Sequence, residues 1–307
     1  MLPKINQQSI RLENKKDTLI ESTNTSNGLN SVDQSTSSEK AIHSLDELAS
    51  LKVADIKAIL GQETVTEELL EALRQDSRSS VQKLVVSYEK KQEKIRQEYE
   101  RIQAMYDYEG IYYSQGMELV AGVDEVGRGP IAGPVTVAAV ILPPYTFIPG
   151  LNDSKKLSEK RREEIYDQIM ELAVAVSCVS YDREKIDALN IYEATRQAMY
   201  EAVRTLSVKA QAVVADAMKL PDLDVPVESI VKGDAKSANI AAASIIAKVT
   251  RDRYMVAMEK EYPGFGFDIH KGYYTDLHRE ALENQGITPI HRRSFEPIKS
   301  MVKGITA

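Results

Sequence analysis

Two adjacent carboxylates interrupt an otherwise apolar segment of this 307-residue chain. The segment Val120–Val126 is rich in β-branched residues, which is typical of a buried strand, and Gly-Arg-Gly-Pro follows it directly. Its polar side chains are Asp124 and Glu125. A buried carboxylate costs roughly several kcal/mol unless a cation or strong hydrogen-bond donors meet it. We therefore interpret this pair as retained for chemistry, and metal binding is the chemistry that fits it best.

Two further acidic residues lie at the ends of predicted secondary-structure elements. Asp216 ends a short apolar run that reads as a strand, and Asp234 precedes a long Ala-rich helical pattern. Carboxylates at strand ends and helix starts can converge on one edge of an α/β sheet. A cluster of this kind can hold two divalent cations for phosphodiester hydrolysis. Taken singly, Asp216 could also be a turn residue and Asp234 a helix N-cap.

Strand geometry limits how these acids can cooperate. Neighbours on a strand point to opposite faces, so Asp124 and Glu125 share a site only if the strand ends or bulges there. The glycines at 127 and 129 make such an ending feasible. Asp252 is a rival acid, but it lies within the long helical pattern beside Arg251 and Arg253, so a structural ion pair is the better interpretation.

The elements that must position the acids form an α/β pattern. Strands are predicted at 119–126, 134–142, 174–180 and 212–217, and helices at 158–172, 183–206, 236–261, 275–284 and 295–302. Two early strands with a short connection, followed by strands separated by helices, indicate a mixed sheet flanked by helices, with a C-terminal helical segment.

The region before the sheet divides into two parts. Residues 1–42 are rich in polar residues without periodicity, which predicts a disordered tail. Residues 43–115 read as a small all-helical N-terminal extension, with a capping box at Ser44 and Glu47 and one long helix over 79–108. Its tyrosines favour a docking face over base stacking. The extension itself could hold nucleic acid or act as a packed spacer, and its acidic balance favours the spacer. Residues 116–307 form the predicted catalytic domain.

Composition narrows the function classes. The single cysteine, Cys178, excludes an intramolecular disulfide framework, and its apolar flanks predict a buried free thiol. Neither a signal peptide nor a run of ~20 apolar residues is present, so we expect a cytoplasmic protein. The net charge of −7 argues against bulk, charge-driven binding of nucleic acid. Residues 230–307 are the basic part, with 12 Lys and Arg against 9 Asp and Glu.

Six segments in a fixed order carry a family resemblance. They are Asp-Glu-Val-Gly-Arg-Gly-Pro at 124–130, Asn-Asp-Ser-Lys-Lys-Leu-Ser at 152–158, Lys-Gly-Asp at 232–234, Ala-Ala-Ala-Ser-Ile-Ile-Ala-Lys-Val-Thr-Arg-Asp at 241–252, His-Lys-Gly-Tyr at 270–273 and His-Arg-Arg-Ser-Phe at 291–295. From about residue 116 to its end, the chain resembles the ribonuclease HII family, the type 2 ribonucleases H.

The resemblance implies a ribonuclease H-like fold and an endoribonuclease that cuts the RNA strand of RNA–DNA hybrids. It also implies incision of duplex DNA on the 5′ side of an embedded ribonucleotide, leaving 3′-hydroxyl and 5′-phosphate ends, with two Mg²⁺ or Mn²⁺ ions. The implied catalytic and metal-binding residues are Asp124, Glu125, Asp216 and Asp234. The chain departs from the family pattern at Ala217, where glycine is usual, which questions the backbone conformation there.

The resemblance also implies the residues that bind substrate. Gly127, Arg128 and Gly129 would contact the 2′-hydroxyl, and Tyr273 would pack against the following deoxyribose. A hydroxyl and two cations before a helix suggest a phosphate clamp at Ser154, Lys155 and Lys156. Judged from the residues alone, the segment 127–129 could also be a strand-ending turn. Tyr273 could be an ordinary core residue, and the segment 154–156 could be the start of a capped helix. Lesser candidates for contact with the nucleic-acid backbone are Lys248, Arg292 and Arg293.

Two other classes of protein remain as alternatives. One is a catalytically silent hybrid-binding protein, and the other is another two-metal nuclease of the same fold acting on DNA alone. A zinc site and a serine hydrolase are unsupported, because the four histidines lack cysteine partners and Gly-x-Ser-x-Gly is absent. The histidines at 270, 278 and 291 are expected to be hydrogen-bonding or surface residues. Nothing in the sequence suggests more than a monomer.

Overall fold

The computed structural model describes residues 48, 50–62 and 65–305 of the chain. The chain divides into two compact units between Arg96 and Gln97, inside one long helix. The predicted polar tail and the predicted capping box at Ser44 and Glu47 lie outside the described residues. In the part that is described, no helix has both the length and the apolar character needed to cross a membrane.

The first unit is helical and has an apolar core of its own. Its helices are α3 (Val53–Ile59), α4 (Glu67–Arg74) and the part of α5 (Ser79–Ala104) that precedes Gln97. Its buried apolar side chains are Leu48, Ile56, Leu60, Leu70, Leu73, Val81 and Val85. The core therefore joins residues from all three helices, as expected for amphipathic segments that cannot bury an apolar face alone.

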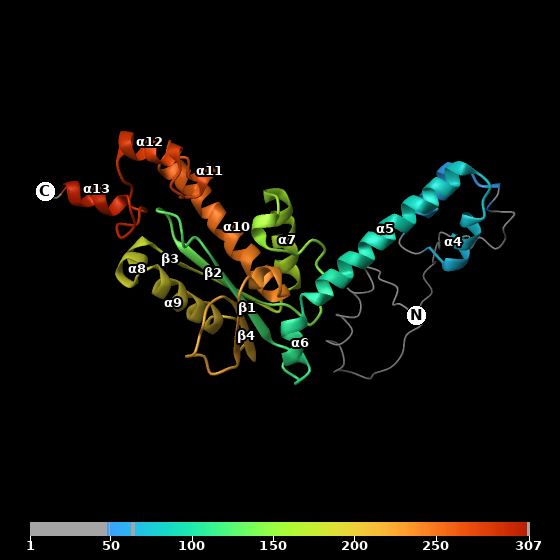
Figure 1. The fold of residues 1–307 in the computed structure, drawn as a ribbon, viewed down its shortest axis with the longest axis horizontal. Helices are drawn as coiled ribbons and strands as arrows, with labels where there is room; N and C mark the ends of the chain where they lie inside the picture. Colours follow the sequence, from blue (N-terminus) through green and yellow to red (C-terminus); the bar gives the residue numbers. More distant parts are fainter. Residues whose placement is uncertain (1–47, 49, 63–64, 306–307) are drawn as a thin grey trace, which may run out of the picture. The chain divides into compact units, whose positions relative to one another are not determined.

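The second unit is built on a mixed five-stranded sheet in the order β3-β2-β1-β4-β5 (Figure 1). Strand β1 is antiparallel to β2, which is antiparallel to β3, and β1 is parallel to β4, which is parallel to β5. The strands are β1 (Val120–Val126), β2 (Val135–Ile141), β3 (Ala175–Tyr181), β4 (Ala212–Asp216) and β5 (Val227–Ile230). The predicted mixed sheet is confirmed.

Helices cover both faces of this sheet (Figure 1). Helices α7 (Glu159–Leu172) and α10 (Ala238–Glu261) pack on one face, and α9 (Ile191–Arg204) packs on the other. The remaining elements are α6 (Asp107–Tyr113), η1 (Ser154–Lys156), α8 (Arg183–Leu189), η2 (Gly233–Ala235), α11 (Phe267–His270), α12 (Asp276–Gln285) and α13 (Ile298–Ile305). Alternate residues of each central strand therefore enter two separate apolar clusters.

Helix α10 lies unusually close to β1, and the cause is a glycine. A Cβ atom on Gly122 would lie 2.0 Å from the carbonyl carbon of Asn239. The Asn239 side chain donates to the Val120 carbonyl at 2.8 Å and accepts from the Leu142 amide at 3.3 Å. These contacts fix the start of α10 against the first two strands of the sheet.

The boundaries of several predicted elements differ from the structure, as for the helix predicted over 295–302, which spans Ile298–Ile305, and one strand was not predicted. The predicted helix over 79–108 is wrong at its end, because α5 stops at Ala104 and α6 begins at Asp107. The predicted helix over 183–206 is broken at Asn190, whose φ is 67° and whose side chain accepts from the Glu193 amide at the start of α9. The short strand β5 was not predicted, because four residues with a mixed burial pattern give no clear period.

The prediction of a buried thiol at Cys178 is wrong, since this residue is exposed. It lies on β3, the edge strand of the sheet, where helices cover the face less completely. The docking interpretation of the tyrosines is supported at Tyr106, which is buried and packs against the rings of Tyr113 and Tyr145.

Candidate active site

The central parallel strands bring the first two acids together. Strands β1 and β4 pair with Val123 beside Ala215, so Asp124 and Asp216 follow as neighbours one residue further along. Both side chains lie on the face of the sheet that α10 covers, because Gly122 and Val214 precede them by two residues and face α10 and the apolar cluster around Ile240. The predicted convergence of these two acids on one sheet edge is thus observed.

Asp234 reaches the same place from the turn before α10. This residue lies in η2, and the N-cap of α10 is Ser237, so Asp234 does not serve as the N-cap of that helix. The amide of Gly233 donates to Asp216 Oδ1 at 2.8 Å, which ties the turn to the end of β4. The Asp234 carboxylate is therefore held beside Asp216.

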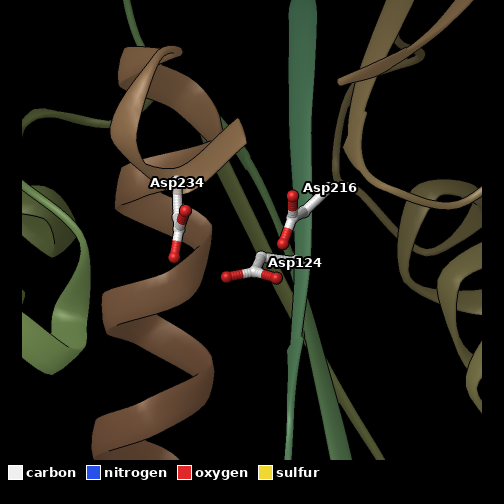
Figure 2. A group of neighbouring side chains, drawn as sticks. All are labelled: Asp124, Asp216 and Asp234. Atoms are coloured by element: carbon white, nitrogen blue, oxygen red, sulfur yellow. The ribbon is translucent and has the colours of Figure 1, made fainter. Parts of the chain in front are cut away.

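Figure 2 shows the three carboxylates of Asp124, Asp216 and Asp234 pointing toward one another. One oxygen atom from each lies within 4.8 Å of the others. Burial raises the pKa of Asp124, and the charges of Glu125 and Asp216 raise it further. Burial, then the charges of Asp153 and Asp216, raises the pKa of Asp234.

These pKa shifts show that the acids repel one another when they are charged. A cation close to the group is Lys155, whose Nζ lies 3.7 Å from Asp234 Oδ2. A divalent cation would relieve the repulsion, and an all-oxygen set suits Mg²⁺ or Mn²⁺ rather than zinc. The donor set therefore fits a metal centre of the predicted kind.

Glu125 does not belong to this group of three. Strand β1 pairs with β2 without a bulge through Val126 opposite Thr136, so Glu125 points to the other face from Asp124. Its Oε1 accepts from Arg128 at 3.2 Å, while its buried Oε2 has no partner among the described residues. Burial raises the pKa of Glu125 despite the Arg128 charge. Its role as a metal ligand stays a prediction.

The predicted phosphate clamp divides into a buried hydroxyl and two exposed amines. Ser154 is 3% exposed, and its hydroxyl lies 2.9 Å from the hydroxyl of Ser244. Ser244 in turn lies close enough to Asp124 to lower the pKa of its carboxyl, a contact that the sequence did not predict within an Ala-rich segment. Lys155 and Lys156 are exposed. The hydroxyl of Ser154 thus supports the acids through Ser244, and the two lysines are accessible to phosphate.

Of the predicted sugar-reading residues, Gly127 is buried, whereas Arg128, Gly129 and Tyr273 are exposed. Gly127 has a φ of +89°, a conformation that favours glycine, and Arg128 and Gly129 are exposed after it. A Cβ atom on Gly129 would lie 3.4 Å from Cε1 of Tyr273, whose side chain is 48% exposed. The exposed part of this segment, Arg128 and Gly129, therefore adjoins the exposed ring of Tyr273.

Known proteins match this chain over both units. The family model for ribonuclease HII matches residues 121–298, and that for the ribonuclease HII N-terminal domain matches residues 52–113. A ribonuclease HII of Ligilactobacillus salivarius is 50% identical over 252 residues, covering 82% of this chain and 98% of the relative. One of Bacillus cytotoxicus is 50% identical over 240 residues, covering 78% and 92%.

The chain belongs to the ribonuclease HII family. Its fold agrees with this membership. The structure of a ribonuclease H2 from Pyrococcus horikoshii aligns with this chain with a TM-score of 0.53 and 28% sequence identity, and the alignment covers 61% of this chain and 98% of that one. The expected ribonuclease H-like fold is confirmed, and the family supports a type 2 ribonuclease H, a nuclease. The domain limits predicted at residues 42 and 115 stay predictions.

The departure from the ribonuclease HII pattern at Ala217 leaves the site in place. Ala217 adopts a φ of 48°, the left-handed conformation that glycine adopts without strain. Its amide still donates to the Ile230 carbonyl at 3.0 Å, and Asp216 keeps its place in the acidic group. The backbone conformation questioned from the sequence is thus retained by an alanine.

The other residues singled out from the sequence differ in their surroundings. The prediction that Arg292 contacts the nucleic-acid backbone is wrong, because its side chain is fully buried. Lys248 donates to Asp252 at 2.7 Å. The predicted ion pair of Asp252 is confirmed, but its partners are Lys248 and Arg162 rather than the adjacent arginines. Lys248 lies one helical turn away, which is the spacing that brings helix side chains together.

Three histidines form a hydrogen-bonded cluster beneath Tyr273. His278 Nδ1 lies 2.9 Å from the Tyr273 carbonyl, and its Nε2 lies 2.9 Å from Nε2 of His291. The amide of Thr288 donates to Nδ1 of His291 at 2.9 Å. His270 stacks on His278 with ring centroids 4.4 Å apart. These contacts confirm the predicted hydrogen-bonding role. His278 and His291 share one proton between their Nε2 atoms only when both rings are neutral.

We expect this cluster to make stability depend on pH. Burial lowers the pKa of His278 from 6.5 to about 4 and that of His291 to about 3. Below pH 6.5 the unfolded chain binds protons that the folded chain excludes, so stability is full above this pH and falls toward pH 4. Each proton that the folded chain excludes lowers the free energy of unfolding by about 1.4 kcal/mol per pH unit. Urea unfolding at pH 7.5, 6.5 and 5.5 measures the slope.

A His278→Gln variant is the control for this slope. It removes one titrating ring, so it should lose stability at pH 7.5 yet show a shallower fall between pH 6.5 and 5.5 than the unsubstituted protein. Carboxylates that titrate at lower pH are common to both proteins and cancel in the comparison. Equal slopes would show that His278 does not exclude a proton in the folded state.

Proposed function

We propose that this chain is a metal-dependent endoribonuclease that hydrolyses the RNA strand of RNA–DNA hybrids. On duplex DNA it would incise on the 5′ side of an embedded ribonucleotide and leave 3′-hydroxyl and 5′-phosphate ends. The observation that carries this proposal is the convergence of Asp124, Asp216 and Asp234 within 4.8 Å. Membership of the ribonuclease HII family supports the same conclusion.

The carboxylates of Asp124, Asp216 and Asp234 would hold the divalent ions, with Glu125 as the fourth proposed ligand. Bound Mg²⁺ or Mn²⁺ supplies activation of water and neutralisation of the charge that develops on the phosphate. The chain supports the ligands through its own hydrogen bonds. The Glu125 amide donates to Asp124 Oδ1 at 2.7 Å, and the Gly233 amide donates to Asp216 Oδ1 at 2.8 Å.

The remaining proposed residues bind and orient the substrate. The exposed amine of Lys155 lies 3.7 Å from Asp234, and that of its exposed neighbour Lys156 follows it in the chain. Both would meet phosphate groups, which positions the nucleic-acid strand without reading its sequence. The segment Gly127, Arg128 and Gly129 would contact the 2′-hydroxyl through its backbone. Tyr273, in contact distance of this segment, would pack against the next sugar.

The exposed glycine segment favours this function over the two alternatives. A nuclease specific for DNA has no need of a close-approaching backbone that reads a 2′-hydroxyl. A silent binding protein has no need of three mutually repelling carboxylates, which make the folded state less stable. Both features are present in the second unit of this chain.

A cleavage assay on one duplex tests the proposal. The substrate is duplex DNA with a single ribonucleotide, and the matched substrate has deoxyribose at that position. We expect a single cut 5′ of the ribonucleotide with Mn²⁺ or Mg²⁺, no cut of the matched duplex, and no cut in EDTA. Binding without cleavage would favour the silent protein, and equal cleavage of both duplexes would favour the DNA nuclease.

A further inference from the structure

Two buried arginines lie beneath the exposed glycine segment. Arg251 is 1% exposed and Arg292 is 0% exposed, and they are the largest of the fully buried side chains. Within the described part of the chain, neither guanidinium forms an ion pair with a carboxylate; both bind backbone carbonyls instead. Burial lowers the pKa of Arg251 to about 10 and that of Arg292 to about 9, so both stay charged at neutral pH. Such cations are costly unless every donor is satisfied.

Arg292 binds three carbonyls of the segment that follows β1. Its Nε donates to Gly133 at 2.9 Å, its Nη1 to Arg128 at 3.0 Å and its Nη2 to Gly127 at 2.5 Å. The backbone amide of Arg292 also donates to the Ile131 carbonyl at 2.8 Å. One side chain thus fixes both ends of the loop between β1 and β2.

Arg251, from α10, binds the remainder of the loop and joins it to the tyrosine segment. Its Nε donates to Pro134 at 2.8 Å and its Nη2 to Ala132 at 3.1 Å. Its Nη1 donates to the Lys271 carbonyl at 2.9 Å, two residues before Tyr273. The two surfaces proposed to read the sugar therefore share one buried support.

The direction of these carbonyls determines where the amides point. In a trans peptide, the carbonyl of one residue and the amide of the next point in opposite directions. The only cis peptide in the described residues precedes Pro297. Because the carbonyls of Gly127 and Arg128 point inward to Arg292, the amides of Arg128 and Gly129 point outward. Both residues are exposed, and neither amide has an acceptor among the described residues.

We propose that Arg251 and Arg292 are positioning residues that set the ribonucleotide specificity of this enzyme, by holding the Arg128 and Gly129 amides outward toward the 2′-hydroxyl. This inference rests on the proposed function. A guanidinium presents its donors in a rigid planar fork that can satisfy three carbonyls at fixed angles. Lysine keeps the charge but not the fork, so Arg→Lys isolates the geometry from the electrostatics.

The test compares Arg292→Lys and Arg251→Lys with Arg253→Lys in the full chain. Arg253 lies on the same helix as Arg251, and its side chain is 52% exposed and paired with Glu163. We measure the ratio of Kd values for all-deoxy duplex and for duplex with one ribonucleotide, in EDTA. This ratio does not depend on the folded fraction of a variant. We also measure kcat and KM with Mn²⁺ on the ribonucleotide duplex.

We expect the Kd ratio to fall about tenfold in Arg292→Lys and in Arg251→Lys, as for the loss of one or two hydrogen bonds. The Arg253→Lys control should keep the ratio of the unsubstituted protein. In the unsubstituted protein, the Arg128 and Gly129 amide resonances should shift more with the ribonucleotide duplex than with the all-deoxy duplex. This last measurement requires no variant.

An unchanged Kd ratio in both buried variants, even with lower activity, would assign the arginines a merely structural role and overturn the inference. Equal amide shifts with both duplexes would also overturn it. In either case, normal cleavage by the unsubstituted enzyme leaves the proposed function standing. If the unsubstituted enzyme cuts neither duplex, or both equally, the proposed function fails and the inference fails with it.

Discussion

Replacing Asp124 by asparagine is expected to lower kcat on a ribonucleotide-containing duplex by about 10³-fold or more, the scale on which removal of one key electrostatic group acts. Asp124 is the most buried acid of the group, and asparagine keeps the volume of its side chain but removes one charge. Hybrid binding should survive or strengthen, because a negative charge facing phosphates is lost. Single-turnover cleavage and a binding titration measure the two effects separately.

The matched control is Asp252→Asn, on α10. Asp252 is the rival acid of the sequence, but its carboxylate pairs with Lys248 at 2.7 Å and lies outside the acidic group. This variant should keep kcat within about twofold while losing about 1 kcal/mol of stability through the partly buried ion pair. Retained turnover in Asp124→Asn would remove the metal-centred mechanism, whereas loss of turnover in Asp252→Asn would place the reaction elsewhere on α10.

Short segments rich in apolar and β-branched residues were enough to predict strands β1, β2, β3 and β4, and the mixed order of the sheet followed from the spacing between them. The same pattern did not predict the break between two helices or the fifth strand. The break at Asn190 carried a local signal, since asparagine both tolerates a positive φ and caps helices, yet the flanking apolar residues continued the helical pattern. Strand β5 is set by pairing with β4, which no local pattern reports.

The acids could be predicted because a carboxylate in an apolar strand is recognised from its neighbours in the sequence. The residues that support the site could not be predicted in this way, because their partners are distant in the sequence. A carboxylate in an apolar strand is conspicuous from its neighbours alone, and strand alternation correctly warned that Asp124 and Glu125 face opposite sides. By contrast, Arg251 and Arg292 resemble any surface arginine in the sequence. All but one of their carbonyl partners lie more than 100 residues earlier in the chain, and the exception, Lys271, lies 20 residues after Arg251. Only the folded structure brings these groups together.

Adding one methyl group at Gly122 is expected to destabilise the second unit by about 4 kcal/mol, the upper range for overpacked core positions. The new Cβ would lie 2.0 Å from the Asn239 carbonyl carbon and 2.3 Å from the Ile240 amide nitrogen. Both atoms belong to the backbone of α10, so no side-chain rotation relieves the overlap. Helix α10 must move instead, which separates Ser244 from Asp124. Urea unfolding and kcat on the ribonucleotide duplex should therefore both change in Gly122→Ala.

Gly110→Ala, on α6, is the matched control for this effect. A Cβ atom there would lie 3.5 Å from the Tyr145 hydroxyl, an ordinary contact, and alanine is favoured over glycine inside a helix by about 0.5–1 kcal/mol. This variant should be as stable as the unsubstituted protein or more stable, with unchanged kcat. If Gly122→Ala instead stays within about 1 kcal/mol of the unsubstituted protein, α10 cannot lie as close to β1 as the structure places it. The place of Ser244 beside Asp124 would then lose its structural basis.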